Sequence, residues 1–165
     1  MVIYATGYKK KYSIFEHDIL KKLGDTSNGL CLYRQIFHPE LPQLAFVGSE
    51  FKIITNMTTS ALQAEWAARW IAGDLGKGFH PTKAEMCRQV KEKLAWKQTI
   101  VSPTANSNNP DIQQINYGDT LLLDMGEWCH RKFPNRFSEY FMPYRSADYN
   151  GLVGLPLKHK STGVR

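Results

Sequence analysis

The sequence predicts an α/β fold in which short buried strands are followed by amphipathic helices, with a helical and irregular extension at the C-terminal end. Two observations favour this class. Short apolar runs at residues 2–5 and 44–48 each lead into a glycine, as strands buried in a parallel sheet commonly do. An alanine-rich segment with apolar residues at helical spacing follows the second run.

The first predicted strand, at residues 2–5, leads into Thr6 and Gly7. A strand buried on both faces needs neighbours on both sides, and only Met1 precedes this one. We therefore expect the chain to be a truncated segment, whose missing partner is the N-terminal portion of the same protein.

Two further strands are expected in the first half of the chain. After a polar stretch with a short helical turn near residues 17–22, residues 30–37 alternate loosely enough to form a strand, which ends at the prolines of residues 38–42. Residues 44–48 form the next strand, and a parallel arrangement with residues 2–5 is plausible.

The clearest helix is expected at residues 58–74. Thr58 or Thr59 is its candidate cap, and the pair Ser60 and Gln63 has the spacing of a capping box. A second helix should begin after Pro81, where Thr82 and Glu85 repeat that spacing, and should fade near Lys97.

The polar, proline-containing residues 101–110 are expected to be a linker or surface loop. A helix is expected at residues 117–130, followed by an irregular tail whose aromatic residues, between 133 and 149, pack on a surface instead of forming their own core. The predicted division is residues 1–100, the linker, and residues 111–165.

Composition and charge exclude several kinds of function. No stretch of the 165 residues approaches the ~20 apolar residues of a membrane span, so no membrane segment is expected. The formal charge is +6, but the basic residues lie in short clusters without a recognisable nucleic-acid module, so no nucleic-acid partner is expected.

The cysteines and the N-terminal residues indicate a reducing, cytoplasmic location. Cys31, Cys87 and Cys129 are odd in number and widely spaced, which predicts neither a disulfide framework nor a metal site. Residues 1–5 do not begin a signal peptide, because no basic leader precedes an apolar segment.

A search for catalytic motifs is largely negative. The glycine-rich phosphate-binding patterns are absent, and Gly73, Gly76 and Gly78 follow a helix, where they are interpreted as a helix stop. No residue stands out as a general acid or base. What remains is the succession of strand, glycine, loop and helix N-terminus at residues 44–62, which could hold an anionic group or could be an ordinary capped helix on a sheet.

The motif at residues 2–8, Val-Ile-Tyr-Ala-Thr-Gly-Tyr, resembles the Ala-Thr-Gly-Tyr strand of flavin-containing monooxygenases and the related Baeyer-Villiger enzymes. Residues 32–48 resemble the segment that leads to the last strand of that family's flavin domain, and residues 61–70 resemble the helix after it. The similarity is strong from residue 1 to about residue 90 and weak beyond residue 110.

The resemblance implies part of a Rossmann-like, two-dinucleotide-binding architecture, in which residues 1–100 form the C-terminal part of the FAD-binding domain. The helix from Thr58 would direct its N-terminus towards the pyrimidine side of the flavin, where its dipole favours the anionic reduced form. The residues implied at the cofactor are Thr6, Gly7, Gly48, Ser49, Glu50, Asn56 and Thr59. The glycine-rich fingerprints of the family are absent from this sequence.

In that family NADPH reduces FAD, and the reduced flavin uses O2 to add one oxygen atom to a nitrogen, a sulfur or a ketone of a small-molecule substrate. The resemblance therefore implies an oxidoreductase segment that needs FAD and NADPH and is inactive alone. Two alternatives stay open. A flavin-dependent reductase of the same architecture would favour Asp after Gly48, where this chain has Ser49; a non-catalytic interaction module would dock through the aromatic tail.

Overall fold

The computed structural model describes residues 2, 11–24, 26, 29–49, 56–76, 78–100 and 114–152. The predicted strand at residues 2–5, apart from Val2, lies outside these residues, as does the predicted linker. The elements in chain order are α1 (His17–Leu23), β1 (Phe37–His38), β2 (Leu41–Ala45), α2 (Asn56–Ala72), α3 (Lys83–Ile100), α4 (Gln114–Asp124), α5 (Arg136–Phe141) and the 3-10 helix η2 (Ser146–Tyr149).

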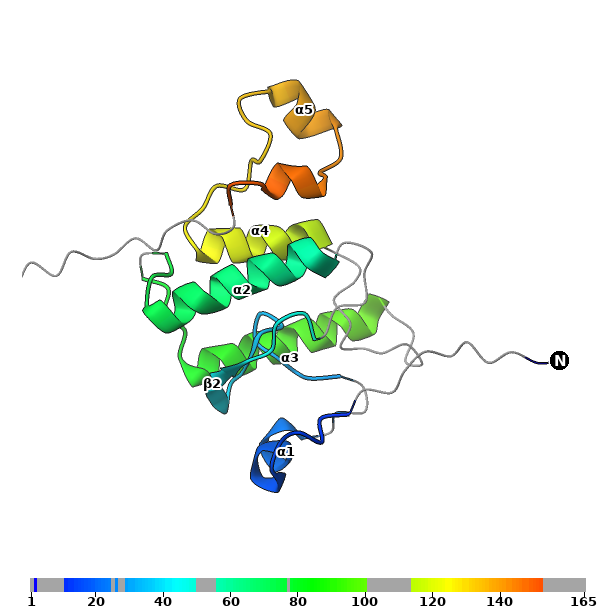
Figure 1. The fold of residues 1–165 in the computed structure, drawn as a ribbon, viewed down its shortest axis with the longest axis vertical. Helices are drawn as coiled ribbons and strands as arrows, with labels where there is room; N and C mark the ends of the chain where they lie inside the picture. The colour runs from blue at the N-terminus through cyan, green and yellow to red at the C-terminus, as the bar shows by residue number, and fades with distance from the viewer. Residues whose placement is uncertain are drawn as a thin grey trace, which may run out of the picture.

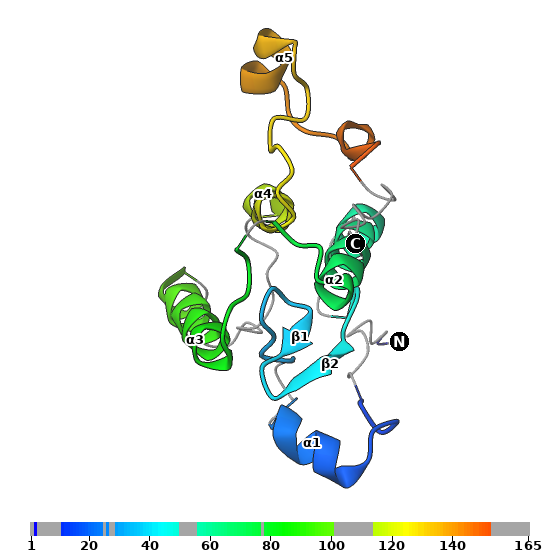
Figure 2. The same cartoon turned by 90° about the vertical axis from the view of Figure 1, so that its left-hand side faces the viewer.

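The described elements form an elongated molecule with the three longest helices in its middle (Figure 1). Helices α2 and α4 pack side by side, and α3 lies on the other side of the strands and runs in the opposite direction to α2. Viewed from the side, the strands lie between α3 and α2, with α1 at one end of the molecule and α5 at the other (Figure 2). The fold combines helices with a small sheet.

The described strands form an antiparallel hairpin, in which Phe37 pairs with Ala45 and His38 with Leu41. The predicted strand at residues 30–37 is therefore wrong over most of its length. Residues 33–36 turn back on themselves, because the Ile36 amide donates to the Tyr33 carbonyl at 3.0 Å. Arg34 and Gln35 both have positive φ angles, 51° and 58°, which a strand does not allow.

The second strand of the hairpin covers residues 41–45. A strand was correctly predicted in this region, but the predicted range of 44–48 begins three residues too late. Pro42 lies inside it, as is tolerated in an edge strand, because each strand of this hairpin has an edge without a partner in the described sheet. The parallel pairing with residues 2–5 stays a prediction.

The three long helices confirm the helical periodicity and correct its ends. Helix α2 begins at Asn56, so Ser60 and Gln63 lie inside the helix and the predicted capping box is wrong. The helix ends at Ala72, and Gly73 follows with φ +67°, as the predicted helix stop requires. For α3, the Thr82 hydroxyl accepts the predicted cap bond from the Glu85 amide at 3.2 Å.

Helix α4 ends at Asp124, six residues before the predicted end at His130. Gly126 has φ +71°, and the Gly76 amide donates to the Asp124 carbonyl at 2.8 Å, so a turn from elsewhere in the chain caps the end of the helix. Trp128, which the prediction placed inside the helix, lies beyond its end and is 59% exposed.

The main core lies between α2, α4, α3 and the hairpin. Its largest fully buried side chain is Trp66, whose ring lies 5.9 Å from that of Phe37 and 5.2 Å from that of Trp70. Helix α4 contributes Leu121 and Leu122, both at 0% exposure. A smaller cluster joins α1 to the hairpin through Leu23, Leu30, Leu32, Leu41 and Phe46.

The helices of the described ranges include none with the length and apolar character of a membrane span. Those same ranges contain no cluster of three or more His, Cys, Asp or Glu side chains suited to a metal ion.

Candidate functional site

The candidate site begins at Gly48, in the turn between β2 and α2. Gly48 has φ +68°, and a Cβ atom at this position would lie 2.7 Å from the Ser60 hydroxyl oxygen. Both the backbone conformation and the close approach of α2 therefore require glycine here. The Gly48 amide is not directed to solvent, because it donates to the Gln63 side-chain oxygen at 2.7 Å.

The N-terminal end of α2 lies beside this turn. The first turn of the helix contains no acidic residue, so no carboxylate of that turn offsets the partial positive charge of the helix end. Met57 in this turn is 88% exposed, whereas Thr59 is only 4% exposed. The end of the helix therefore carries partial positive charge, the Met57 side chain is exposed on it, and Thr59 belongs to its inner face.

The predicted site residues are brought together only in part. Gly48 and Ser49 lie in the turn, and Asn56 and Thr59 lie in the first turn of α2, which Ser60 joins to Gly48. Thr6, Gly7 and Glu50 lie outside the described residues. Their role, and that of the four placed residues, stays a prediction.

A buried polar network, not expected from the sequence, supports this turn from inside. The Gln63 side chain is fully buried, and its nitrogen donates to the Tyr117 hydroxyl at 2.9 Å. Tyr117, from α4, donates in turn to the Arg34 carbonyl at 2.6 Å. Burial raises the pKa of Tyr117, so the hydroxyl keeps its proton at neutral pH and remains a donor.

Asp124, at the end of α4, joins the same region through its carboxylate. Arg34 donates to it through two nitrogens, at 2.7 and 3.1 Å, and the Trp66 indole donates at 3.1 Å. Burial raises the pKa of Asp124, and the Arg34 guanidinium acts in the opposite direction. Ninety positions separate Arg34 and Asp124, which explains why no local pattern could reveal the pair.

A second buried cation holds the segment after α4 against α2. Arg69 is 4% exposed and donates to Glu65 and Glu127, both at 2.9 Å, and to the Met125 carbonyl at 3.3 Å. Two carboxylates and a carbonyl oxygen accept hydrogen bonds from the Arg69 guanidinium, and such partners stabilise a buried positive charge. These contacts fix the direction in which the chain leaves the core.

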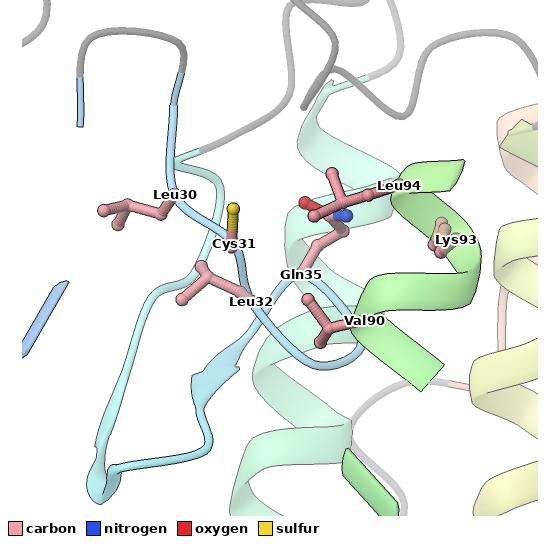
Figure 3. A pocket seen from close by; sticks show the side chains of 7 residues that line it. All are labelled: Leu30, Cys31, Leu32, Gln35, Val90, Lys93 and Leu94. Atoms are coloured by element: carbon pink, nitrogen blue, oxygen red, sulfur yellow. The ribbon is translucent and has the colours of Figure 1, made fainter. Parts of the chain in front are cut away.

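The small cavity between the turn at residues 30–35 and α3 is not a substrate pocket. Its volume is about 10 Å³, which is about the space of one water molecule. Figure 3 shows the Gln35 side chain reaching towards Leu94 of α3 across this space. The lining residues are Leu30, Cys31, Leu32, Gln35, Val90, Lys93 and Leu94.

The described part of the candidate site consists of the Gly48 turn and the N-terminal turn of α2, whose backbone amides carry partial positive charge. The arrangement is suited to holding an electron-rich group against the turn and the end of α2.

Comparison with known proteins identifies the group of proteins to which this arrangement belongs. Residues 1–130 match the family described as flavin-binding monooxygenase-like. Flavin-containing monooxygenase 3 of Rattus norvegicus is 31% identical over 160 residues, covering 93% of this chain and 28% of that protein. The human putative dimethylaniline monooxygenase (N-oxide-forming) 6 is 35% identical over 98 residues, covering 58% of this chain and 17% of that protein.

A solved structure agrees with the sequence comparison. S-allyl-L-cysteine S-oxygenase from Allium sativum superposes with a TM-score of 0.60 and 28% identity, over 75% of this chain and 27% of that one. The chain belongs to the flavin-binding monooxygenase-like family. It spans 28% of the length of the rat relative.

The family implies dependence on a flavin and NADPH, and the described residues fit one edge of such a cofactor. The Gly48 turn packs closely on α2, whose N-terminal turn has no acidic side chain to repel the electron-rich part of a flavin. The fit is limited to this edge, because the described residues include no glycine-rich turn between a strand and a helix that could hold the phosphates.

Proposed function

We propose that this chain is the C-terminal part of an FAD- and NADPH-dependent monooxygenase that inserts one oxygen atom from O2 into a small molecule. The observation that supports it most strongly is the family match over residues 1–130, which includes the Gly48 turn and α2. Within this proposal residues 1–100 complete an FAD-binding, Rossmann-like domain, residues 101–110 link it to residues 111–165, and α4 packs back on α2.

The residues of this chain would hold the flavin and tune its charge. When bound, FAD accepts a hydride from NADPH and supplies the redox chemistry towards O2. The end of α2 would stabilise negative charge on the reduced ring, because its amides and dipole present partial positive charge. Gly48, Ser49, Glu50, Asn56 and Thr59 are the proposed residues beside the ring, with Thr6 and Gly7 nearer the domain boundary.

The remaining part of the cofactor sites would come from the N-terminal portion of the same protein. This chain spans 28% of the rat relative and has no glycine-rich fingerprint. We therefore propose that residues 1–165 alone neither hold FAD tightly nor turn over.

Soft nitrogen and sulfur atoms are the proposed sites of oxygenation. The structural neighbour carries the name of an S-oxygenase, and one of the relatives is described as N-oxide-forming. The assay below has to distinguish these substrates from a ketone substrate, which Baeyer-Villiger chemistry would use.

The test is to purify the native gene product from its source, record its intact mass and its absorbance between the near ultraviolet and the blue, and follow NADPH oxidation. Dimethylaniline, S-allyl-L-cysteine and cyclohexanone serve as nitrogen, sulfur and ketone probes. We expect a flavin spectrum and a product that has gained one oxygen atom from the nitrogen or the sulfur probe.

Other results would redirect the proposal. A product from cyclohexanone alone would replace the nitrogen and sulfur substrates with ketones. A colourless native protein that does not oxidise NADPH with any probe would contradict the proposed function and would favour a non-catalytic interaction module.

A further inference from the structure

Gln63 lies where three segments of the chain meet beneath the Gly48 turn. It is 0% exposed, and its amide contacts the Gly48 amide, the Tyr117 hydroxyl and, at a longer 3.4 Å, the Gln35 carbonyl. These groups belong to the turn before α2, to α4 and to the turn before β1. A buried glutamine with all its bonds directed at other segments is an unusual use of a long polar side chain, which is ordinarily found at the surface.

The hydrogen bonds of this side chain can run in only one direction. A backbone amide can only donate, so the Gly48 amide requires the Gln63 oxygen as its acceptor. The Gln63 nitrogen must then donate to Tyr117, whose hydroxyl uses its own proton on the Arg34 carbonyl. The Gly48 amide at one end can only donate, and the Arg34 carbonyl at the other end can only accept. The Gln63 side-chain amide therefore satisfies all these bonds in one orientation only, because exchanging its oxygen and nitrogen would break them.

The far end of this chain of bonds is firmly held. Arg34 has φ +51°, and its side chain is joined to Asp124 at the end of α4 by two hydrogen bonds. Tyr117 therefore contacts a turn that α4 also holds by an ion pair. At the near end, Gly48 lies close to the Ser60 side chain and donates to Gln63, so two residues of α2 contact it.

We propose that Gln63 is a positioning residue for the Gly48–Ser49 turn, and that Tyr117 of α4 holds the Gln63 amide in the orientation that the Gly48 amide requires. This inference rests on the proposed function, since the turn is the proposed edge of the flavin site. It makes α4, which lies outside residues 1–100 of the proposed FAD-binding domain, a part of what holds the Gly48–Ser49 turn in place.

The first experiment uses the 165-residue chain without any cofactor. Amide hydrogen exchange and the nitrogen-proton resonances of the glycines are measured by NMR in Tyr117→Phe and in Gln63→Leu. We expect the Gly48 amide to exchange at least about tenfold faster and its resonance to shift, because it loses its partner or that partner's orientation. The Gly73 amide, at the other end of α2, should stay as it is.

The matched control is Tyr140→Phe, which removes the same hydroxyl from a residue that is 73% exposed. It should leave the Gly48 amide unchanged. If Gln63→Leu does not fold, Tyr117→Phe decides alone, because it preserves the ring that packs in the core. Unchanged Gly48 exchange in Tyr117→Phe, or an equal acceleration at Gly48 and Gly73, would overturn the proposal.

The second experiment places Tyr117→Phe in the native flavoprotein and measures the dissociation constant of FAD and the visible flavin spectrum. A several-fold weaker affinity with a shifted spectrum is expected. Altered Gly48 exchange with unchanged affinity and spectrum would overturn the positioning role while the proposed function stands. A native protein without flavin would overturn the proposed function, and Gly48 exchange would still decide whether Tyr117 orients Gln63.

Discussion

The α2–α4 core and the aromatic tail, which we define as residues 128–152, are built in different ways. In the core, Trp66, Leu121 and Leu122 are completely buried. In the tail, neither α5 nor η2 has a buried residue, and the rings of Phe137, Tyr140 and Phe141 are each about 70% exposed. Aromatic side chains are therefore buried in the core in one region and lie exposed at the surface in the other.

The tail is held largely by contacts of charged side chains, and Cys129, Tyr149 and Leu152 are half-buried against the core. The Arg131 side chain is fully buried, pairs with Asp119 of α4, and lies 4.5 and 4.4 Å from the ring centres of Tyr144 and Tyr149. Glu139 accepts from the Lys132 amide and contacts Tyr144. The difference teaches that buried side chains hold the core together, whereas contacts of a few polar side chains, with Tyr149 and Leu152 packed against the core, hold the tail.

Replacing Trp66 with alanine should break the core most severely. The side chain fills the space between the rings of Tyr33, Phe37 and Trp70, so Trp66→Ala should lower the free energy of unfolding by about 3–5 kcal/mol. Trp128→Ala, at a ring that is 59% exposed, is the matched change in the tail and should cost under about 1 kcal/mol. Urea denaturation measures both, and similar losses would refute the contrast.

The ion pair of Arg34 and Asp124 should be the next most sensitive feature. Asp124→Asn keeps the shape but leaves the guanidinium, whose side chain is 21% exposed, without its carboxylate, and should cost about 2–3 kcal/mol. Arg88→Gln, in an exposed pair on α3, is the control and should leave the urea midpoint unchanged. A loss in Asp124→Asn no greater than in the control would show that the pair contributes nothing.

Gly48→Ala should be destabilising by about 1–3 kcal/mol, because both its positive φ and its contact with Ser60 oppose a side chain. Gly73→Ala has nearly the same φ, +67°, with open space around it, and so isolates the backbone strain. Adding Ser60→Ala to Gly48→Ala should remove the difference between the two variants. Equal unfolding midpoints for Gly48→Ala and Gly73→Ala would contradict a packing role for Ser60.

Removing the Arg131 guanidinium should loosen the tail with little effect on the core. Arg131→Met keeps much of the side-chain volume but loses Asp119 and the two tyrosine rings, so limited proteolysis should cut residues 131–152 faster. The urea midpoint of the core, followed by tryptophan fluorescence, should move little. A large fall in that midpoint would show that tail and core unfold together.

The smallest expected effect is a pH dependence from His38. Burial lowers the pKa of His38, Lys83 acts in the same direction, and Glu40 opposes them. The Nδ1 atom accepts a hydrogen bond from the Glu40 amide at 3.2 Å, which protonation at that atom would remove. A lowered folded-state pKa means that the unfolded chain binds the proton more readily, so this stability is full above the ordinary pKa of 6.5 and is lost as the pH falls through the folded value.

The measurement is the urea midpoint at about pH 7.5 and about pH 5.5, in the wild type and in His38→Gln. The wild type should lose slightly more stability on acidification than the variant. An equal loss in both would assign the pH dependence to other groups.

Several local features could be predicted from the sequence. Thr82 caps α3 as its spacing indicates, and Gly73 ends α2 as its lack of a side chain allows. Gly48 was identified as a turn residue after a strand, and the structure shows that its positive φ and its contact with Ser60 favour glycine there. The capping box of Ser60 and Gln63 was wrong because a glutamine can satisfy a distant amide as readily as a nearby one, and spacing does not distinguish the two.

By itself the sequence determined the helical periods, the Thr82 cap of α3, the Gly73 stop of α2 and, through motifs in the right order, membership of a flavoprotein family. These properties depend on neighbours within a few positions or on order along the chain. Only the tertiary structure decided that residues 33–36 form a turn and not a strand, that Arg34 pairs with Asp124, and that Gln63 bonds to Tyr117. The last two contacts join segments far apart in the chain, and burial of polar groups favours such pairing once the core has formed.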